Sequence, residues 1–268
     1  MHSLTRWDTR VALRALVLGA IAFLVAWLVT ATTDEGGIAW GVRAGRTLPI
    51  APVCAAIATA IVIAQARARG EVRALEALGR SPAENAIAAV AGGAATAVVA
   101  ALVMAASAKV DVDGFFPVAR HGVTYAFVEG GFVDRASGWR IEADGAIARV
   151  DADPSASASA SLPRHARNAA ALSTGLSGIA LPLLAAHLLL TRPLAASGAR
   201  RARFGRGSPL RAFAVVAAAA VASILSFHAA AVGRIPALVA SLPMALLLAA
   251  ALFRYRSKSW RHSEGSKT

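Results

Sequence analysis

Charged residues are scarce in this chain. Asp, Glu, Lys and Arg make up only 16% of its 268 residues, whereas 57% are hydrophobic and the mean hydropathy is +0.57. A soluble domain of this size needs more polar surface than such a composition supplies, so the sequence indicates an integral membrane protein. The net charge of +13 does not indicate nucleic-acid binding, because the basic residues flank apolar segments.

The chain has a single cysteine and lacks two common catalytic motifs. Cys54 is the only cysteine and lies within an apolar segment, which excludes an intrachain disulfide and indicates a small core residue. Neither a G-x-x-x-x-G-K-S/T phosphate loop nor a G-x-S-x-G nucleophile motif occurs. We therefore expect a chain that is not itself an enzyme and that binds no metal or cofactor of its own.

Long apolar segments are the main feature that is present. An α-helix rises about 1.5 Å per residue, so roughly 20 apolar residues cross a hydrocarbon core of about 30 Å. The first segment follows Arg6, Arg10 and Arg14, as a signal peptide would, but its length and the lack of a small-x-small cleavage site predict that it stays uncleaved. We predict six transmembrane helices, at residues 11–31, 47–66, 85–107, 169–191, 211–232 and 235–253.

The distribution of Lys and Arg predicts the orientation of these helices. Eighteen of the 28 basic residues lie before the first helix, in the second and fourth connections, and after the sixth helix, where five acidic residues accompany them. The other three connections hold ten basic and ten acidic residues. Since positively charged loops stay in the cytoplasm, we expect both termini there.

The third connection, residues 108–168, is the only long segment outside the predicted spans. Short alternating runs at 123–128, 138–141 and 146–150, separated by turns at Gly130-Gly131 and Asp144-Gly145, predict two or three β-hairpins on the outer face. Residues 154–163, PSASASASLP, indicate a flexible linker. About 45 ordered residues without a disulfide make a marginal core, so this module is expected to lean on the membrane domain or on a partner. The predicted fold class is an α-helical integral membrane protein with six transmembrane helices and a small β-rich outer insertion, divided into domains 1–107, 108–168 and 169–268.

One polar segment, residues 67–84, separates the second and third predicted spans. Its apolar residues recur at spacings of three with charged residues beside them, which predicts a short amphipathic helix at about 68–79, too short to span a bilayer. Gly79 suits the left-handed residue that ends a helix. Ser81 and Glu84 predict the capping box that begins the next helix. The helix residues are Glu71, Val72, Arg73, Leu75, Glu76 and Leu78.

Two histidines, His187 and His228, fall within the predicted spans, where ionisable groups often mark a site. Neither has a second metal-binding residue at a suitable spacing, so hydrogen bonding between helices is the expected role. An intramembrane hydrolase that pairs a histidine with a nearby serine is the rival interpretation. Gly92 and Gly93 indicate a close helix contact. The serines concerned are Ser173, Ser177, Ser223 and Ser226.

The fourth predicted connection is strongly basic. Two interpretations stay open: its arginines anchor the cytoplasmic side of the chain, or they contact anionic lipid or a bound cytoplasmic subunit. The arginines are Arg200, Arg201, Arg203 and Arg206.

Two short segments and the order of the spans resemble a known family, the LptF/LptG-type (YjgP/YjgQ) permeases of the lipopolysaccharide export ABC transporter. GEVRALEALGRS, residues 70–81, is similar to the family's E-L-x-x-x-x-x-x-G-x-S coupling segment, with Val72 in place of the leucine. GRIPALVASLP, residues 233–243, is similar to the segment that enters the family's sixth span, with Ser241 in place of a tryptophan. In that family three spans precede a periplasmic β-domain, three follow it, and a coupling helix joins the second and third.

The resemblance implies a permease subunit that extracts lipopolysaccharide or a related lipid from the inner membrane of a Gram-negative bacterium. It implies an LptB-like ATPase dimer that holds ATP and magnesium, a second permease of the same type, and an LptC-like or other periplasmic lipid-bridge protein. Glu71 would contact a basic side chain of the ATPase, and the apolar face of the helix would pack in its groove. The coupling residues so implied are Glu71, Val72, Arg73, Leu75, Leu78, Gly79 and Ser81.

Two features depart from the family pattern. Residues 108–168 are too few for the family's β-jellyroll, so the periplasmic module is reduced. Asp34 and Glu35 follow the first span where the family has basic residues, and Arg43 and Arg46 are the candidate lipid-headgroup contacts instead. A rival function from another class is a membrane scaffold that recruits an envelope partner through the outer hairpins.

Overall fold

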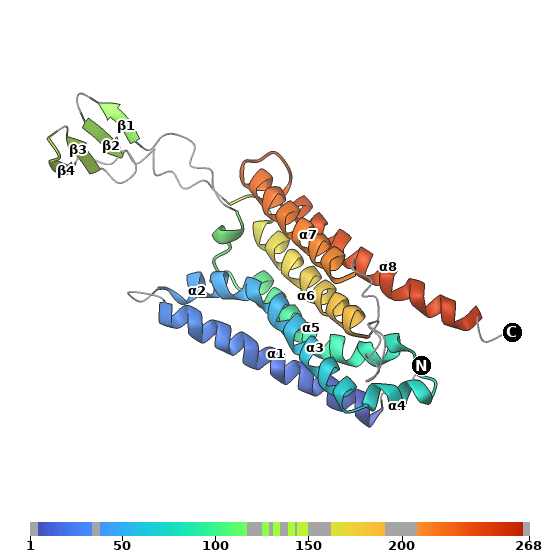
Figure 1. Cartoon of the computed structure of the whole chain (residues 1–268). Coiled ribbons are helices and arrows are strands. Elements are labelled where there is room, and N and C mark those ends of the chain that lie inside the picture. Colours follow the sequence, from blue (N-terminus) through green and yellow to red (C-terminus); the bar gives the residue numbers. More distant parts are fainter. Residues whose placement is uncertain are drawn as a thin grey trace.

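The structure is a computed structural model that describes residues 5–33, 38–116, 125–128, 131–134, 139–142, 144–149, 162–190 and 208–264. Within these residues the chain forms mainly α-helices, with a small antiparallel sheet between α5 and α6 (Figure 1). The helices are α1 (Arg6–Thr33), α2 (Trp40–Thr47), α3 (Ala51–Ala68), α4 (Glu71–Ala77), α5 (Pro82–Ala106), α6 (Ala166–Leu190), α7 (Ser208–Ala231) and α8 (Leu242–Glu264), and the 3₁₀ turns are η1 (Leu48–Ile50), η2 (Asp113–Phe115) and η3 (Ala237–Ser241).

Five helical segments of the described chain are long and apolar enough to cross a membrane, and they correspond to the first five predicted spans. The second of them is a composite, since η1 joins α2 to α3 where Pro49 and Pro52 lie at the starts of successive helices. The five segments are Arg6–Thr32, Trp40–Ala68, Pro82–Ala106, Ala166–Leu190 and Phe213–Ala231.

The sixth predicted span, residues 235–253, is not one regular helix. Pro236 precedes η3, and Pro243 lies in the first turn of α8, so the missing N–H groups of proline mark the start of each element. The apolar part of this region, Ala237–Phe253, is shorter than the other five segments. Five spans therefore have the required length and composition, and the sixth stays a prediction.

The helices form a layered bundle with α6 near its centre. α1 lies along one edge and packs on α3 and α5, whereas α7 lies toward the other edge and packs on α8 and η3 (Figure 1). α6 packs on α3, α5 and α8, and so joins the two halves.

Small residues let these helices approach closely. A Cβ atom at Gly92 of α5 would collide with the backbone carbonyl of Ala12 in α1, and one at Gly93 would collide with the Thr59 hydroxyl of α3. Gly178 of α6 lies in the same way against Ala97 of α5. The predicted contact at the glycine pair is thus confirmed, as expected for helices packed in a bilayer.

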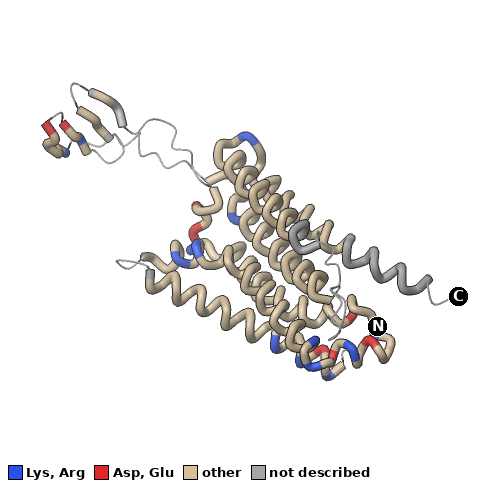
Figure 2. The backbone as a smooth tube through the Cα atoms, viewed as in Figure 1, with Lys and Arg blue, Asp and Glu red and all other residues tan. Residues whose placement is uncertain are grey.

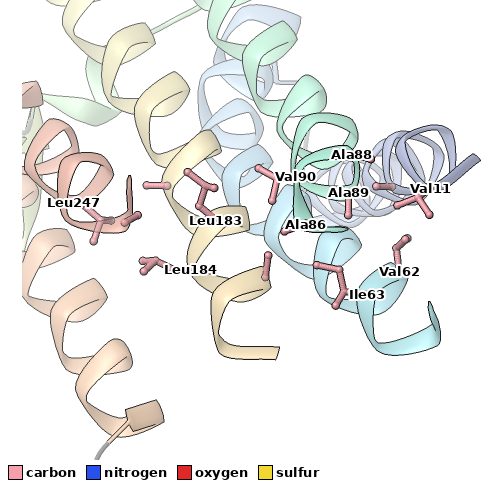
Figure 3. Close-up of a cluster of buried hydrophobic side chains, with 14 residues drawn as sticks. Val11, Val62, Ile63, Ala86, Ala88, Ala89, Val90, Leu183, Leu184 and Leu247 are labelled. Carbon is pink, nitrogen blue, oxygen red and sulfur yellow. The ribbon is translucent and has the colours of Figure 1, made fainter. Parts of the chain in front are cut away.

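The core at the α4 end of the bundle draws on five helices. Figure 3 shows Val11 of α1, Ile63 of α3, Val90 of α5, Leu183 of α6 and Leu247 of α8 gathered in this cluster. Most of its other buried members are alanines, so shape complementarity between close helices, rather than large side chains, holds this end together.

The sheet is an antiparallel meander in the order β1-β2-β3-β4. The predicted β-rich module is therefore present, and its three successive hairpins lie within the predicted two or three. The predicted Asp144-Gly145 turn is confirmed, since Gly145 has φ 84° and its N–H donates to the Glu142 carbonyl. The sequence interpretation missed β2, because Gly131 was taken as part of a turn. The strands are β1 (Tyr125–Val128), β2 (Gly131–Asp134), β3 (Trp139–Glu142) and β4 (Ile147–Arg149).

Candidate functional site

α4 is a separate short helix set between two glycines with left-handed backbone. Gly70 precedes it with φ 76°, and Gly79 follows it with φ 88°. The Gly79 and Arg80 N–H groups donate to the Glu76 and Leu75 carbonyls, both at 3.0 Å, which is a Schellman helix end. The prediction for Gly79 is confirmed. The helix is shorter than the predicted 68–79, because Gly70 turns the chain after α3 has already continued to Ala68.

The capping box that starts α5 is also as predicted. The Ser81 N–H donates to Glu84 Oε2 at 2.7 Å, and the Glu84 N–H donates to Ser81 Oγ at 3.2 Å. Pro82 occupies the first helical turn, where a backbone N–H would have no acceptor within the helix. The start of α5 is therefore fixed directly after α4 ends.

Four side chains tie α4 and the start of α5 to the first turn of α1. The indole N–H of Trp7 donates to Glu71 Oε2 at 2.9 Å, and Arg80 Nη2 donates to Asp8 Oδ1 at 2.9 Å. The Arg80 guanidinium also lies over the Trp7 ring, 5.5 Å from its centroid. Trp7, Asp8, Glu71 and Arg80 are called the Trp7–Arg80 cluster below. Since α1 carries two of these residues, α4 cannot move freely without moving α1.

Sequence reasoning found Glu71 but missed the other three members of the cluster. Their partners are 64 and 72 residues away, and no local pattern reports such pairing. One local signal was available: Thr5 and Asp8 form a capping box, since the Thr5 N–H donates to Asp8 Oδ2 and the Asp8 N–H donates to Thr5 Oγ1. The T-x-x-D spacing explains why α1 begins at Arg6 rather than at the predicted residue 11.

The side chains of α4 differ in how far they are available to a partner. Val72 is buried inside this chain at 6% exposure, so it offers little surface to a partner in this structure, and its contact with an ATPase stays a prediction. Leu75 is half-buried, and Leu78 is 82% exposed. Arg73 and Glu76 are exposed. The available surface is therefore Leu78 with its charged neighbours rather than the whole apolar stripe.

Charged residues gather at this end of the bundle. Figure 2 shows basic and acidic residues around α4 and the first turns of α1, a long middle stretch without charge, and a second charged group near α2. This pattern fits two polar surfaces separated by a membrane. The basic segment that contains Arg200, Arg201, Arg203 and Arg206 lies outside the described residues, as does most of the 154–163 linker.

The candidate headgroup residues Arg43 and Arg46 lie on α2, at the end of the bundle opposite α4. Gly41 and Gly45 press α2 against the backbone of Lys109 and Asp111, where a Cβ would collide with their carbonyls. Arg46 and Asp111 both line a cavity of about 460 Å³. The structure therefore brings Arg46 to a cavity of mixed character, which it shares with Asp111 and with apolar residues such as Phe115.

One acidic group near this cavity has an altered proton affinity. Partial burial is the larger cause that raises the pKa of Asp113 above its ordinary value, and the negative charge of Asp111 is a smaller cause in the same direction. The Asp113 N–H donates to Asp111 Oδ1 at 2.8 Å, which holds the two carboxylates close together.

Two serines of the rival hydrolase interpretation form hydrogen bonds within their own helices. Ser177 and Ser226 donate to carbonyls of their own helices, at 2.8 Å to Ser173 and 2.8 Å to Ala222. His228 is exposed on α7. Among the described residues no group of three His, Cys, Asp or Glu side chains is placed to hold a metal ion.

The fold and these polar ends define a class, a multi-pass integral membrane protein. Comparison with protein-family models, curated proteins and solved structures found no match to this chain.

Proposed function

We propose that this chain is the membrane subunit of an ABC transporter that extracts lipopolysaccharide or a related lipid from the inner membrane of a Gram-negative bacterium. A separate LptB-like ATPase dimer, which binds the ATP and magnesium, docks on α4 and supplies the energy. The observation that carries this proposal is α4 itself, a short helix between Gly70 and Gly79, exposed at Leu78 and fixed to α1 by the Trp7–Arg80 cluster. When a partner displaces a helix held in this way, α1 and α5 move with it as a rigid body.

The exposure of two edge helices supports a partner permease. In the 18-residue apolar stretch of α1, only 17% of the residues are buried inside the chain, and the same share is buried in α7. In the other three long segments the share is 56% to 61%. We propose that α1 and α7 of two permease subunits, in a homodimer or a heterodimer, enclose the lipid. In this arrangement six spans cross the membrane, both termini are cytoplasmic, and Arg43 and Arg46 face lipid headgroups on the periplasmic side.

The geometry refines the role proposed for Glu71. One carboxylate oxygen accepts from Trp7, and the other lies 3.7 Å from Arg69 Nη1. Glu71 thus serves to join α4 to α1, and a basic ATPase side chain that approaches it must share this carboxylate. The exposed contacts of the ATPase are then Leu78, Arg73 and Glu76, whereas Gly79 and Ser81 set the ends of the adjacent helices.

The proposal is tested by Leu78→Asp, with Leu162→Asp as the matched control. Leu162 is also exposed, but it precedes α6 at the opposite end of the bundle. The full chain is purified in mild detergent from its native host, and the retained proteins are identified by mass spectrometry. We expect an LptB-like ATPase with the unmodified chain and with Leu162→Asp, and its loss with Leu78→Asp. Absence of any ATPase from all three samples contradicts the proposal.

A membrane scaffold is the second candidate function, and one observation favours it. The outer sheet exposes large apolar residues, including Phe127 and Ile147. A scaffold predicts that the same purification retains a stable envelope protein and no ATPase.

A further inference from the structure

One face of the sheet β1–β4 carries five large apolar side chains, together with the charged Arg149, which pairs with Trp139. Residues paired across antiparallel strands lie on the same face. The register pairs Phe127 with Phe132, Phe132 with Ile141, and Ile141 with Ile147, so these four form a row across all four strands. Trp139 lies two residues before Ile141 and shares its face. These five residues are called the apolar sheet face below.

The apolar sheet face is open. Its side chains are exposed by 48% at Ile141, 49% at Trp139, 54% at Phe132, 68% at Ile147 and 70% at Phe127. The Phe127 and Phe132 rings touch each other, with centroids 5.3 Å apart, and the Arg149 guanidinium lies over the Trp139 ring, 5.8 Å from its centroid. In the described part of the chain, the other four side chains of the apolar sheet face stay open to a partner. Contiguous exposed apolar surface of this kind marks a place where another molecule packs.

The opposite face of the sheet has a different character. It carries Val133, Arg140, Glu142 and Ala148, which are small or charged, and Arg140 Nε lies 3.7 Å from Glu142 Oε1. The sheet is therefore two-sided: one face is suited to water, and the large apolar side chains gather on the other, where a second layer can pack.

The neighbouring segments of this chain do not carry enough apolar side chain to form that layer. The stretches around the strands that lie outside the described residues are 117–124, 129–130, 135–138, 143 and 150–161. Their only large apolar residues are Val118, Val123 and Val150. Three valines offer less apolar surface than two phenylalanines, two isoleucines and a tryptophan, which favours another molecule as the covering layer.

We propose that the apolar sheet face packs against the same face of a second copy of this chain, which produces a two-layer sandwich of eight strands. Half-exposed side chains of this size each contribute about 100 Å², so two copies bury roughly 1,000 Å² in total, the lower limit for a specific interface. Two copies in one membrane present their sheets on the same side, and a two-fold axis along the membrane normal brings identical faces together.

Charge favours this occupant over an anionic membrane surface. Residues 125–149 contain four acidic and three basic residues, so the module is nearly neutral. Two nearly neutral modules do not repel each other, whereas attraction to anionic lipid headgroups needs an excess of Lys and Arg. The proposal does not depend on the transport function, since it concerns only the outer sheet.

Site-directed crosslinking of the full chain in its membrane tests the proposal. Cys54 is the only cysteine, so Cys54→Ala provides a background into which single cysteines are placed. Phe132→Cys and Ile141→Cys report on the apolar sheet face, and Val133→Cys and Ala148→Cys are matched controls on the opposite face. A bis-maleimide whose reach matches the spacing of about 10 Å between packed sheets is then added. We expect crosslinked dimer from the two apolar-face variants, alone and when coexpressed with each other, and its absence from the two controls.

A charge substitution provides an independent measurement. Ile141→Lys, introduced beside the Phe132→Cys reporter, is expected to reduce the crosslinked dimer by on the order of tenfold, because an unpaired charge is then buried in the interface. Ala148→Lys, on the opposite face, leaves the yield unchanged.

Three results overturn the proposal. Equal crosslinking on both faces shows random collision, and crosslinking to a different protein shows another partner. Absence of dimer, together with quenching of a dye at Phe132→Cys by brominated lipid, shows that the membrane covers the face. The absence of an ATPase changes none of these crosslinking and quenching results. Failure of the transport proposal is therefore distinguished from failure of this one.

Discussion

Arg80 brings together segments that lie far apart in the sequence. Its guanidinium donates to the buried carboxylate of Asp8 and lies over the Trp7 ring, while its Nη1 atom is buried with no hydrogen-bond partner in the described chain. An arginine in this position depends on the single carboxylate that faces it, because little water reaches the pair.

We expect Asp8→Asn to lower the free energy of unfolding by roughly 2 kcal/mol, since the charge of Arg80 then stays half-buried without its counter-ion. Thermal unfolding of the detergent-solubilised chain provides the measurement. In the double variant Asp8→Asn/Arg80→Gln the loss should be smaller than the two single losses added together. Additive losses would contradict the pairing.

Residue-level prediction from the sequence succeeded where the relevant partner is close by. The capping box of Ser81 and Glu84 and the left-handed Gly79 follow from spacings of a few residues, which sequence periodicity reports directly. The Trp7 to Glu71 hydrogen bond could not be predicted, because it depends on how α1 docks beside α4. The burial of Val72 has the same origin: its spacing fits an amphipathic helix, but tertiary packing decides which part of that helix is covered.

Packing between α5 and α6 depends on one glycine rather than on glycine in general. Gly178 faces Ala97 so closely that a Cβ has no room, whereas a Cβ at Gly175, one turn earlier on α6, would make an ordinary contact of 3.4 Å with Ala101. Substitution by alanine at these two positions therefore differs in the steric contact with α5 but not in helix propensity.

We predict that Gly178→Ala is less stable than Gly175→Ala by about 1–3 kcal/mol, the usual cost of overpacking a filled core. Both substitutions gain the same helix propensity of roughly 1 kcal/mol, so the comparison isolates the contact. Midpoints of thermal unfolding, measured in one detergent, give the difference. Equal midpoints would mean that α5 and α6 are not in the close contact described.

At the scale of elements, long apolar segments were predicted well and short ones poorly. Five spans were found because about 20 apolar residues leave little choice in a bilayer. α2 was missed because its eight residues carry two glycines and two arginines, and it is helical through its docking on Lys109 and Asp111. β2 was missed because its four residues begin with the second glycine of a pair and carry too little pattern to distinguish a strand from a turn.

The whole molecule depends on whether the last apolar segment crosses the membrane. The stretch Ala237–Phe253 is short, but α8 continues to Glu264, and η3 packs on both α6 and α7. If α8 crosses, the C-terminal tail lies on the same side as α4. If it does not, the tail lies on the side of the sheet.

Labelling with a membrane-impermeant maleimide in the Cys54→Ala background separates these two topologies. Leu78→Cys is exposed on the α4 side, and Ala146→Cys is exposed in the turn between β3 and β4, so they mark the two faces. With both termini in the cytoplasm, as the distribution of Lys and Arg predicts, intact cells label only Ala146→Cys, and permeabilised cells also label Leu78→Cys and Ser266→Cys. Labelling of Ser266→Cys in intact cells would leave five spans, and the two halves of the bundle would then present different faces to a partner subunit. The unmodified Cys54→Ala chain, which has no thiol, gives the background signal.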